Sequence, residues 1–99
     1  MYKFDGQQYK INQTITFSYG IRTVDMTQDH LFLSIGTFGY DVYVYKHNGT
    51  QFNHFQNFTY THNSYNWVSI TNDHQYLTVS HQSAQEVHRY FYNKISEKF

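Results

Sequence analysis

The sequence lacks cysteine and proline, and its seven basic and seven acidic residues leave no net charge. Without cysteine, disulfide bonds and thiolate chemistry are excluded. Without a basic stripe to follow a phosphate backbone, we expect no nucleic-acid partner. No apolar run approaches the roughly 20 residues that span a bilayer, and residues 1–10 lack the apolar segment of a signal peptide. We therefore expect a soluble chain with no membrane partner, in a compartment that the sequence leaves unknown.

The motifs of common catalytic and metal sites are also missing. The sequence contains no Gly-x-Ser-x-Gly turn and no phosphate-binding glycine loop. His74, His81 and His88 recur every seven residues, but zinc requires imidazoles that converge on one point. On a strand and its flanking turns these three side chains would lie apart. We expect no metal ion, no cofactor and no enzymatic activity.

The sequence does contain an internal repeat. Residues 22–36 align without a gap on residues 66–80, at an offset of 44. The identical pairs are Val24 with Val68, Thr27 with Thr71, Asp29 with Asp73, His30 with His74, and Leu33 with Leu77. A period near 44 in a strand-forming sequence is typical of a β-propeller, in which each repeat is one four-stranded blade.

Two further alignments extend the repeat over most of the chain. Residues 2–17 align on residues 45–60 at an offset of 43, and residues 41–48 align on residues 86–93 at an offset of 45. The predicted fold class is therefore all-β, with about two four-stranded antiparallel blades of a larger or oligomeric propeller. The chain divides into the outer two strands of one blade over 1–17, a complete blade over 21–60, and a partial next blade over 65–99.

Strand formers alternate with turn residues throughout, and no segment has a helical stripe. The predicted strands cover 2–5, 8–17, 21–27, 31–36, 41–47, 51–60, 65–71, 75–80 and 86–92, and a further strand could begin over 95–99. Asn48-Gly49 predicts a type I′ hairpin turn with positive φ at both residues. In the turn at Gln28-Asp29-His30, we expect the Asp to accept a backbone amide two residues on and the His to be left-handed.

These strands resemble the blades of WD-repeat propellers. The segments TVDMTQDHLFLSIG and WVSITNDHQYLTVS look like the first two strands of a blade, and DVYVYK looks like the third. The Gly-His motif of that family is missing, and Tyr45-Lys46 and Tyr90-Phe91 replace its Trp-Asp ending. A weaker resemblance is to integrin-type repeats, although their calcium-binding aspartate pattern is absent. The resemblance implies a propeller. Because these motifs are missing, it does not imply that this chain has the Asp–His hydrogen-bond network of the WD-repeat family.

An open pair of blades would leave two apolar faces in water. Propellers close with about four to eight blades. At roughly 25 cal/mol per Å², several hundred Å² on each face would forfeit on the order of 10 kcal/mol, which is comparable to the whole stability of a domain. We therefore expect copies of the chain to close a ring head to tail, or the chain to belong to a longer propeller. The N-terminal strands would complete the unfinished blade of a neighbour.

Aromatic residues make up 21% of the chain. This abundance indicates either a recognition surface or a bias in coding composition. In a propeller, the loops that connect blades and the loops that connect second to third strands emerge on one face. The predicted partner-binding residues on this face are Tyr19, Phe38, Tyr40, Tyr60, His62 and Tyr65, with Trp67 either on this face or in the core.

Amphipathic rings of this kind suit protein anchors or stacking on sugars, although several could instead pack under their own loops. The leading prediction is a non-enzymatic scaffold that binds a protein partner. The first alternative is a carbohydrate-binding, lectin-like propeller. The second is a propeller hydrolase with its active site in the central channel, which would need two facing carboxylates.

Overall fold

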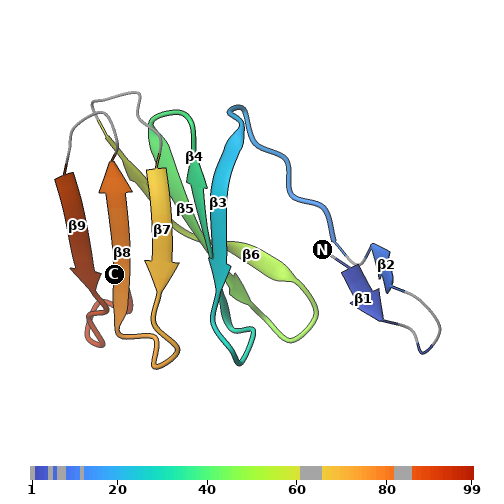
Figure 1. Ribbon diagram of the computed structural model, residues 1–99. Helices are drawn as coiled ribbons and strands as arrows, with labels where there is room; N and C mark the ends of the chain where they lie inside the picture. Colours follow the sequence, from blue (N-terminus) through green and yellow to red (C-terminus); the bar gives the residue numbers. More distant parts are fainter. Residues whose placement is uncertain (1, 5, 7–8, 12, 61–65, 82–85) are drawn as a thin grey trace.

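The structure is a computed structural model that describes residues 2–4, 6, 9–11, 13–60, 66–81 and 86–99. The described residues form nine strands and no helix, which confirms the predicted all-β class. The strands build three antiparallel sheets, and in each sheet neighbours in the chain are neighbours in space (Figure 1). This meander order follows from short turns, which join antiparallel strands without a crossover.

The three sheets follow one another along the chain. The N-terminal hairpin pairs β1 (Tyr2–Phe4) with β2 (Tyr9–Ile11). The four-stranded sheet contains β3 (Ile21–Met26), β4 (Phe32–Thr37), β5 (Asp41–His47) and β6 (Phe52–Thr59). The three-stranded sheet contains β7 (Asn66–Ile70), β8 (Tyr76–His81) and β9 (Glu86–Phe91). By sequence repeat, β7, β8 and β9 correspond to β3, β4 and β5.

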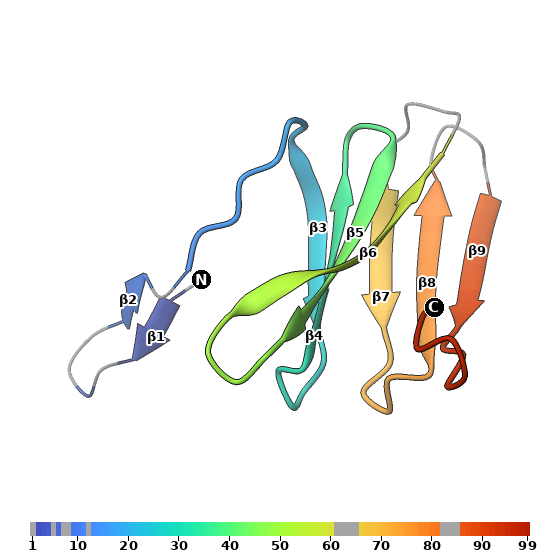
Figure 2. The same ribbon diagram turned by 180° about the vertical axis from the view of Figure 1, so that it is seen from behind.

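The two larger sheets pack against each other, with β3 and β7 side by side (Figures 1 and 2). A single apolar layer, the intersheet core, fills the space between them. It consists of Phe32, Val42 and Val44 from the four-stranded sheet and Val68, Ile70, Leu77 and Val79 from the three-stranded sheet. Alternate residues of each strand supply it, as the two-residue period of a strand requires.

The turn between β3 and β4 is built on the side chains of Thr27 and Asp29. Thr27 Oγ1 donates to Asp29 Oδ1 over 2.7 Å and accepts from the Phe32 amide over 3.1 Å. Asp29 Oδ1 also accepts from the Leu31 amide, and His30 is left-handed with a φ of 65°. The turn between β7 and β8 repeats these contacts with Thr71, Asp73, Gln75, Tyr76 and a left-handed His74. Both predictions for this turn are confirmed.

The N-terminal hairpin has the geometry of the far end of the β5–β6 pair. Its register joins Tyr2 to Ile11 and Phe4 to Tyr9. Adding the offset of 43 gives the register of the β5–β6 pair, which joins Tyr45 to His54 and His47 to Phe52. Gly6 and Gly49 share a φ of 100°. The sequence alignment at this offset is therefore also an alignment of strand pairing.

Three sequence predictions are wrong in detail. No strand begins over 95–99, where the chain instead makes a turn closed by the bridge between Asn93 and Lys98. The strand predicted over 8–17 ends at Ile11. Residues 13–17 form no ladder, because β1 pairs with Tyr9–Ile11 and does not extend beside them. The hairpin turn at Asn48-Gly49 is not type I′, because Gly49 but not Asn48 has positive φ. The loop instead has four residues, in which Asn48 Oδ1 accepts from the amides of Thr50 and Gln51 over 2.9 Å each.

Candidate interaction surfaces

An aromatic cluster lies at the end of the four-stranded sheet where β3 begins and β4 ends. Tyr19 and Tyr40 meet edge to face, with ring centroids 6.1 Å apart. The Phe38 amide donates to the carbonyl of Gly20 over 2.9 Å. A side chain at Gly39 would overlap the Tyr19 ring, so this close approach depends on glycine. Tyr19, Phe38 and Tyr40 are all exposed, and three of the predicted site residues therefore share one end of the sheet.

Arg22 and Trp67 extend the aromatic cluster across β3 and β7. The guanidinium carbon of Arg22 lies 4.9 Å from the Trp67 ring centroid and 5.9 Å from that of Phe38, within the range of cation–π attraction. Trp67 is 52% exposed, so the alternative that places it in the core is wrong. Val68 and Ile70 point inward, and the alternation of β7 turns Trp67 away from them. Sequence reasoning missed Arg22, for which the repeat provides no signal.

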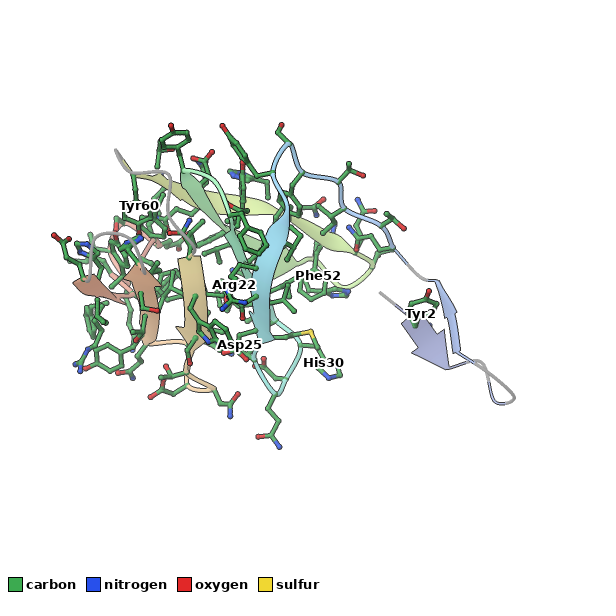
Figure 3. The ribbon with its side chains drawn as sticks, turned by 45° about the horizontal axis from the view of Figure 1, so that its top comes forward. Tyr2, Arg22, Asp25, His30, Phe52 and Tyr60 are labelled. Atoms are coloured by element: carbon green, nitrogen blue, oxygen red, sulfur yellow. The ribbon has the colours of Figure 1, made fainter. Side chains whose placement is uncertain are left out.

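Tyr60 does not belong to the aromatic cluster and lies away from Arg22 (Figure 3). Its hydroxyl is 2.8 Å from the hydroxyl of Tyr90, and its ring packs on His81 with centroids 4.1 Å apart. Burial between the sheets raises the pKa of Tyr60 above its ordinary value, and the bond to Tyr90 raises it further. Tyr60 is therefore a packing residue. The remaining predicted residues, His62 and Tyr65, lie outside the described residues.

The four-stranded sheet has a second apolar face, termed the front face, which points away from the three-stranded sheet. On it, Val24 is 58% exposed, whereas its repeat equivalent Val68 is 2% exposed in the intersheet core. Ile21 and Met26 are also exposed. A hollow of about 160 Å³ opens on this face, lined by Gln13, Ile15, Phe17, Ile21, Val24, Leu33 and Ile35. The front face thus has the side chains of a packing surface.

The three-stranded sheet has a corresponding back face, which points away from the four-stranded sheet. Val87 is 68% exposed on it, whereas its equivalent Val42 is fully buried. The guanidinium of Arg89 lies 4.1 Å above the Tyr76 ring. In the described part of the chain, β9 pairs with β8 alone, so its other edge presents open backbone groups. The repeat is the signal for both faces, because equivalent residues predict equivalent packing.

Polar contacts fix the two sheets along β3 and β7. These contacts are Asp25 Oδ2 with the Ile70 amide, Asn72 Oδ1 with the Gln28 amide, and Asp29 Oδ2 with His74 Nε2, each over 2.8 Å. In Figure 3, Asp25 lies on the side of β3 that faces β7, and His30 lies on the opposite side of the turn that follows β3. Hydrogen bonds from Thr27 and from the Leu31 amide, with a smaller contribution from His74, lower the pKa of Asp29.

Two glutamine side chains hold peptide groups of the next repeat. Gln56 donates to the Phe99 carbonyl and accepts from the Phe99 amide, each over 2.9 Å. Gln13, which aligns with Gln56, makes the same pair of bonds to Phe52 over 2.8 and 2.9 Å. Both held residues follow a hairpin loop that begins with an Asn whose side chain accepts two backbone amides. Residues 13–17 therefore lie on the four-stranded sheet as the end of β6 lies on the three-stranded sheet.

Within the described ranges, no group of three or more His, Asp or Glu side chains is placed to hold a metal ion. The same residues include no helix of the length and apolarity needed to cross a membrane. In comparisons with known proteins, no family model matches the chain, and no curated protein matches it.

Proposed function

We propose that the two larger sheets are successive β-propeller blades of a WD-repeat-like type, and that the chain is a non-enzymatic protein-interaction scaffold. Each sheet is an antiparallel meander, which is the strand order of a blade. The first strands, β3 and β7, run in the same direction beside each other in Figure 1, as the inner strands of neighbouring blades do around a channel. The matching turns support two copies of one unit.

The observation that carries the scaffold proposal is the aromatic cluster. Tyr19, Phe38, Tyr40 and Trp67 are exposed beside the cationic Arg22. Tyr, Trp and Arg are the residue types that dominate binding energy at protein interfaces. The close approach of Gly39 positions Tyr19, and a backbone hydrogen bond positions Phe38, so these two residues lose little conformational freedom when a partner binds.

A carbohydrate ligand fits this surface less well. Sugar rings stack on open aromatic faces, and the guanidinium of Arg22 already lies over the Trp67 ring at 4.9 Å. Tyr19 and Tyr40 meet edge to face rather than presenting one flat platform. The proposal therefore favours a peptide segment as ligand, with Arg22 available to an acidic or carbonyl group.

Selection from a phage-displayed library of random peptides tests the proposal. We expect peptides that bind the chain and lose at least about tenfold in affinity with Tyr40→Ala or Trp67→Ala, the effect of a hot-spot residue. Asn53→Ala, an exposed change on β6, serves as the control and should leave binding unchanged. Peptide binding that survives both aromatic substitutions would remove the aromatic cluster as the site. Binding to a glycan array in place of peptides would support the lectin alternative.

A further inference from the structure

We infer that the front and back faces are the two halves of one head-to-tail contact, and that the occupant of each face is a second copy of this chain. The inference rests on the proposed propeller architecture. It goes beyond that architecture by specifying which residues of one copy meet which residues of the next. The template is the contact between the two sheets within a single chain, carried over by the repeat offsets.

The front face repeats the surface that the three-stranded sheet presents to the intersheet core. Five residues around the front hollow have equivalents in or against that core. The equivalent pairs are Ile15 with Phe58, Phe17 with Tyr60, Val24 with Val68, Leu33 with Leu77, and Ile35 with Val79. Even the ring contacts recur, since Phe17 lies 4.8 Å from Tyr43 where Tyr60 lies 5.9 Å from His88. The hollow is therefore the place in which a copy of the four-stranded sheet's inner face would fit.

The back face of the three-stranded sheet has residues equivalent to those of the inner face of the four-stranded sheet. Tyr76 stands where Phe32 contributes to the intersheet core, and Val87 stands where Val42 is buried. Arg89 replaces Val44, and its guanidinium is already held over the Tyr76 ring. This arrangement covers part of the charge with an aromatic face while the aliphatic stem remains available for packing. The back face of one copy can thus cover the front face of the next.

Polar groups beside the front and back faces are also equivalent to polar groups that meet between the two sheets of one chain. Asp29 contacts His74 across the sheets of one chain, over 2.8 Å. The equivalent contact between copies joins Asp73 of one copy to His30 of the next, and both residues lie in turns of the same conformation. Hydrogen bonds from Thr71 and the Gln75 amide lower the pKa of Asp73, so it meets His30 as a carboxylate. Ser69 stands in the place of Asp25 and lacks the carboxylate of that contact.

The open edge of β9 completes the contact. In the four-stranded sheet, β5 pairs with β6 so that Asp41 faces Thr59 and Tyr43 faces Asn57. The repeat offsets transfer this register to β9 of one copy and residues 13–17 of the next. It predicts that Glu86 faces Thr16, Val87 faces Ile15, His88 faces Thr14, and Arg89 faces Gln13. Thr16 would then donate to Glu86 as Thr59 donates to Asp41 over 2.6 Å. Strand addition of this kind is an established mode of association.

The hairpin partner of β2 stands in the way of the full contact. By the same offsets, Tyr2 and Lys3 of β1 occupy the positions of Tyr90 and Phe91 of the incoming β9. One of the two strands has to give way, and β1 is a three-residue strand that, among the described strands, pairs with β2 alone. Isolated two-stranded hairpins are marginal in water. We therefore infer that β1 pairs with β2 in the separate chain and that β9 of another copy displaces β1 when the ring forms.

Native mass spectrometry of the chain tests the contact. Because each chain supplies two blades and propellers close with about four to eight, we expect a closed ring of two to four chains. Val24→Lys and Val87→Lys each place a charge on one half of the contact at a side chain that is exposed in a single chain. Either substitution should dissociate the ring, and the exposed control Asn53→Lys should leave it intact. A wild-type monomer at micromolar concentration would overturn the inference.

Cysteine pairing tests the register, since the chain contains no other cysteine. Equimolar Thr14→Cys and His88→Cys chains, mixed under oxidising conditions, should give mainly a mixed covalent dimer. Thr14→Cys with Lys94→Cys is the control and should give little. Predominant dimers of Thr14→Cys with itself would indicate a symmetric contact and overturn the head-to-tail geometry. A monomeric chain that still selects peptides through the aromatic cluster would overturn the ring alone and leave the proposed function intact.

Discussion

At the scale of single residues, Asp29 serves two structures at once. One carboxylate oxygen organises the turn between β3 and β4, and the other lies 2.8 Å from His74 of the neighbouring sheet. Hydrogen bonds within the turn lower its pKa from the ordinary value of 3.8. A group with a lowered pKa in the folded state contributes stability above its unfolded pKa and loses it as the pH falls through the folded pKa.

The first prediction compares Asp29→Asn with Asp73→Asn. Both substitutions remove a carboxylate that accepts from the turn, so both should lower the melting temperature at neutral pH. Asp29→Asn also removes the carboxylate that contacts His74 within the same chain, whereas the contact inferred for Asp73 joins two copies and is lost when they separate. The loss of stability below about pH 4 should become shallower in each variant, since a titrating group is gone. Thermal melts at several pH values check this. An unchanged dependence of the melting temperature on pH below about pH 4 in both variants would contradict it.

Residue patterns also show how far sequence reasoning reaches. The left-handed histidines and the aspartate turns are predictable, because both depend on local hydrogen bonds. The exposure of Trp67 follows from strand alternation once Val68 and Ile70 are assigned to the core. The contact of Arg22 with Trp67 is not predictable, because it joins β3 to β7 through side chains that the repeat does not relate.

At the scale of elements, the largest difference from expectation is the segment 13–17. Its sequence has the alternation of a strand, yet it has no ladder. A strand forms only where a neighbour offers its backbone, and β1 ends before it reaches this segment. Ile15 and Phe17 instead pack on Leu33, Ile35 and Phe52. Sequence pattern predicts the propensity to pair, but it cannot supply the partner strand.

The second prediction concerns β1. Deletion of residues 1–6 should strengthen self-association by several-fold, because it uncovers the edge of β2 that we assign to β9 of another copy. The dissociation concentration, measured by light scattering on dilution, gives the result. Replacing residues 1–4 by Gly and Ser at constant length should have the same direction of effect, since it also weakens the β1–β2 pair. Weaker association in both variants would show that β1 supports the contact.

At the scale of the whole molecule, one glycine sets how closely the sheets approach. A Cβ atom at Gly36 would overlap the backbone carbonyl oxygen of Asn66 in the other sheet and crowd Thr23. Backbone cannot yield as a flexible side chain does, so a larger residue at this position would separate β4 from β7. The equivalent position on the three-stranded sheet is Ser80, on the back face, so the inferred contact between copies has to be wider at this point than the contact between the two sheets of one chain.

The third prediction is that Gly36→Ala destabilises the chain by about 1–3 kcal/mol, the usual cost of overpacking a closely packed site. Urea unfolding at a fixed chain concentration measures it. Ser80→Ala is the matched control, and it should change the free energy of unfolding by less than about 0.5 kcal/mol, because it adds no atoms at a partly exposed position. Equal effects of the two substitutions would contradict the role assigned to Gly36.

The paired glutamines carry a consequence for sequence drift. A glutamine amide that accepts from one backbone N–H and donates to one backbone carbonyl binds the main chain, and these bonds do not depend on the side chain at that position. The hydrogen bonds at positions 52 and 99 therefore do not themselves require Phe, whose rings are needed there for core packing. Bonds of this kind allow the sequences of successive repeats to change while the repeats keep the same relative placement.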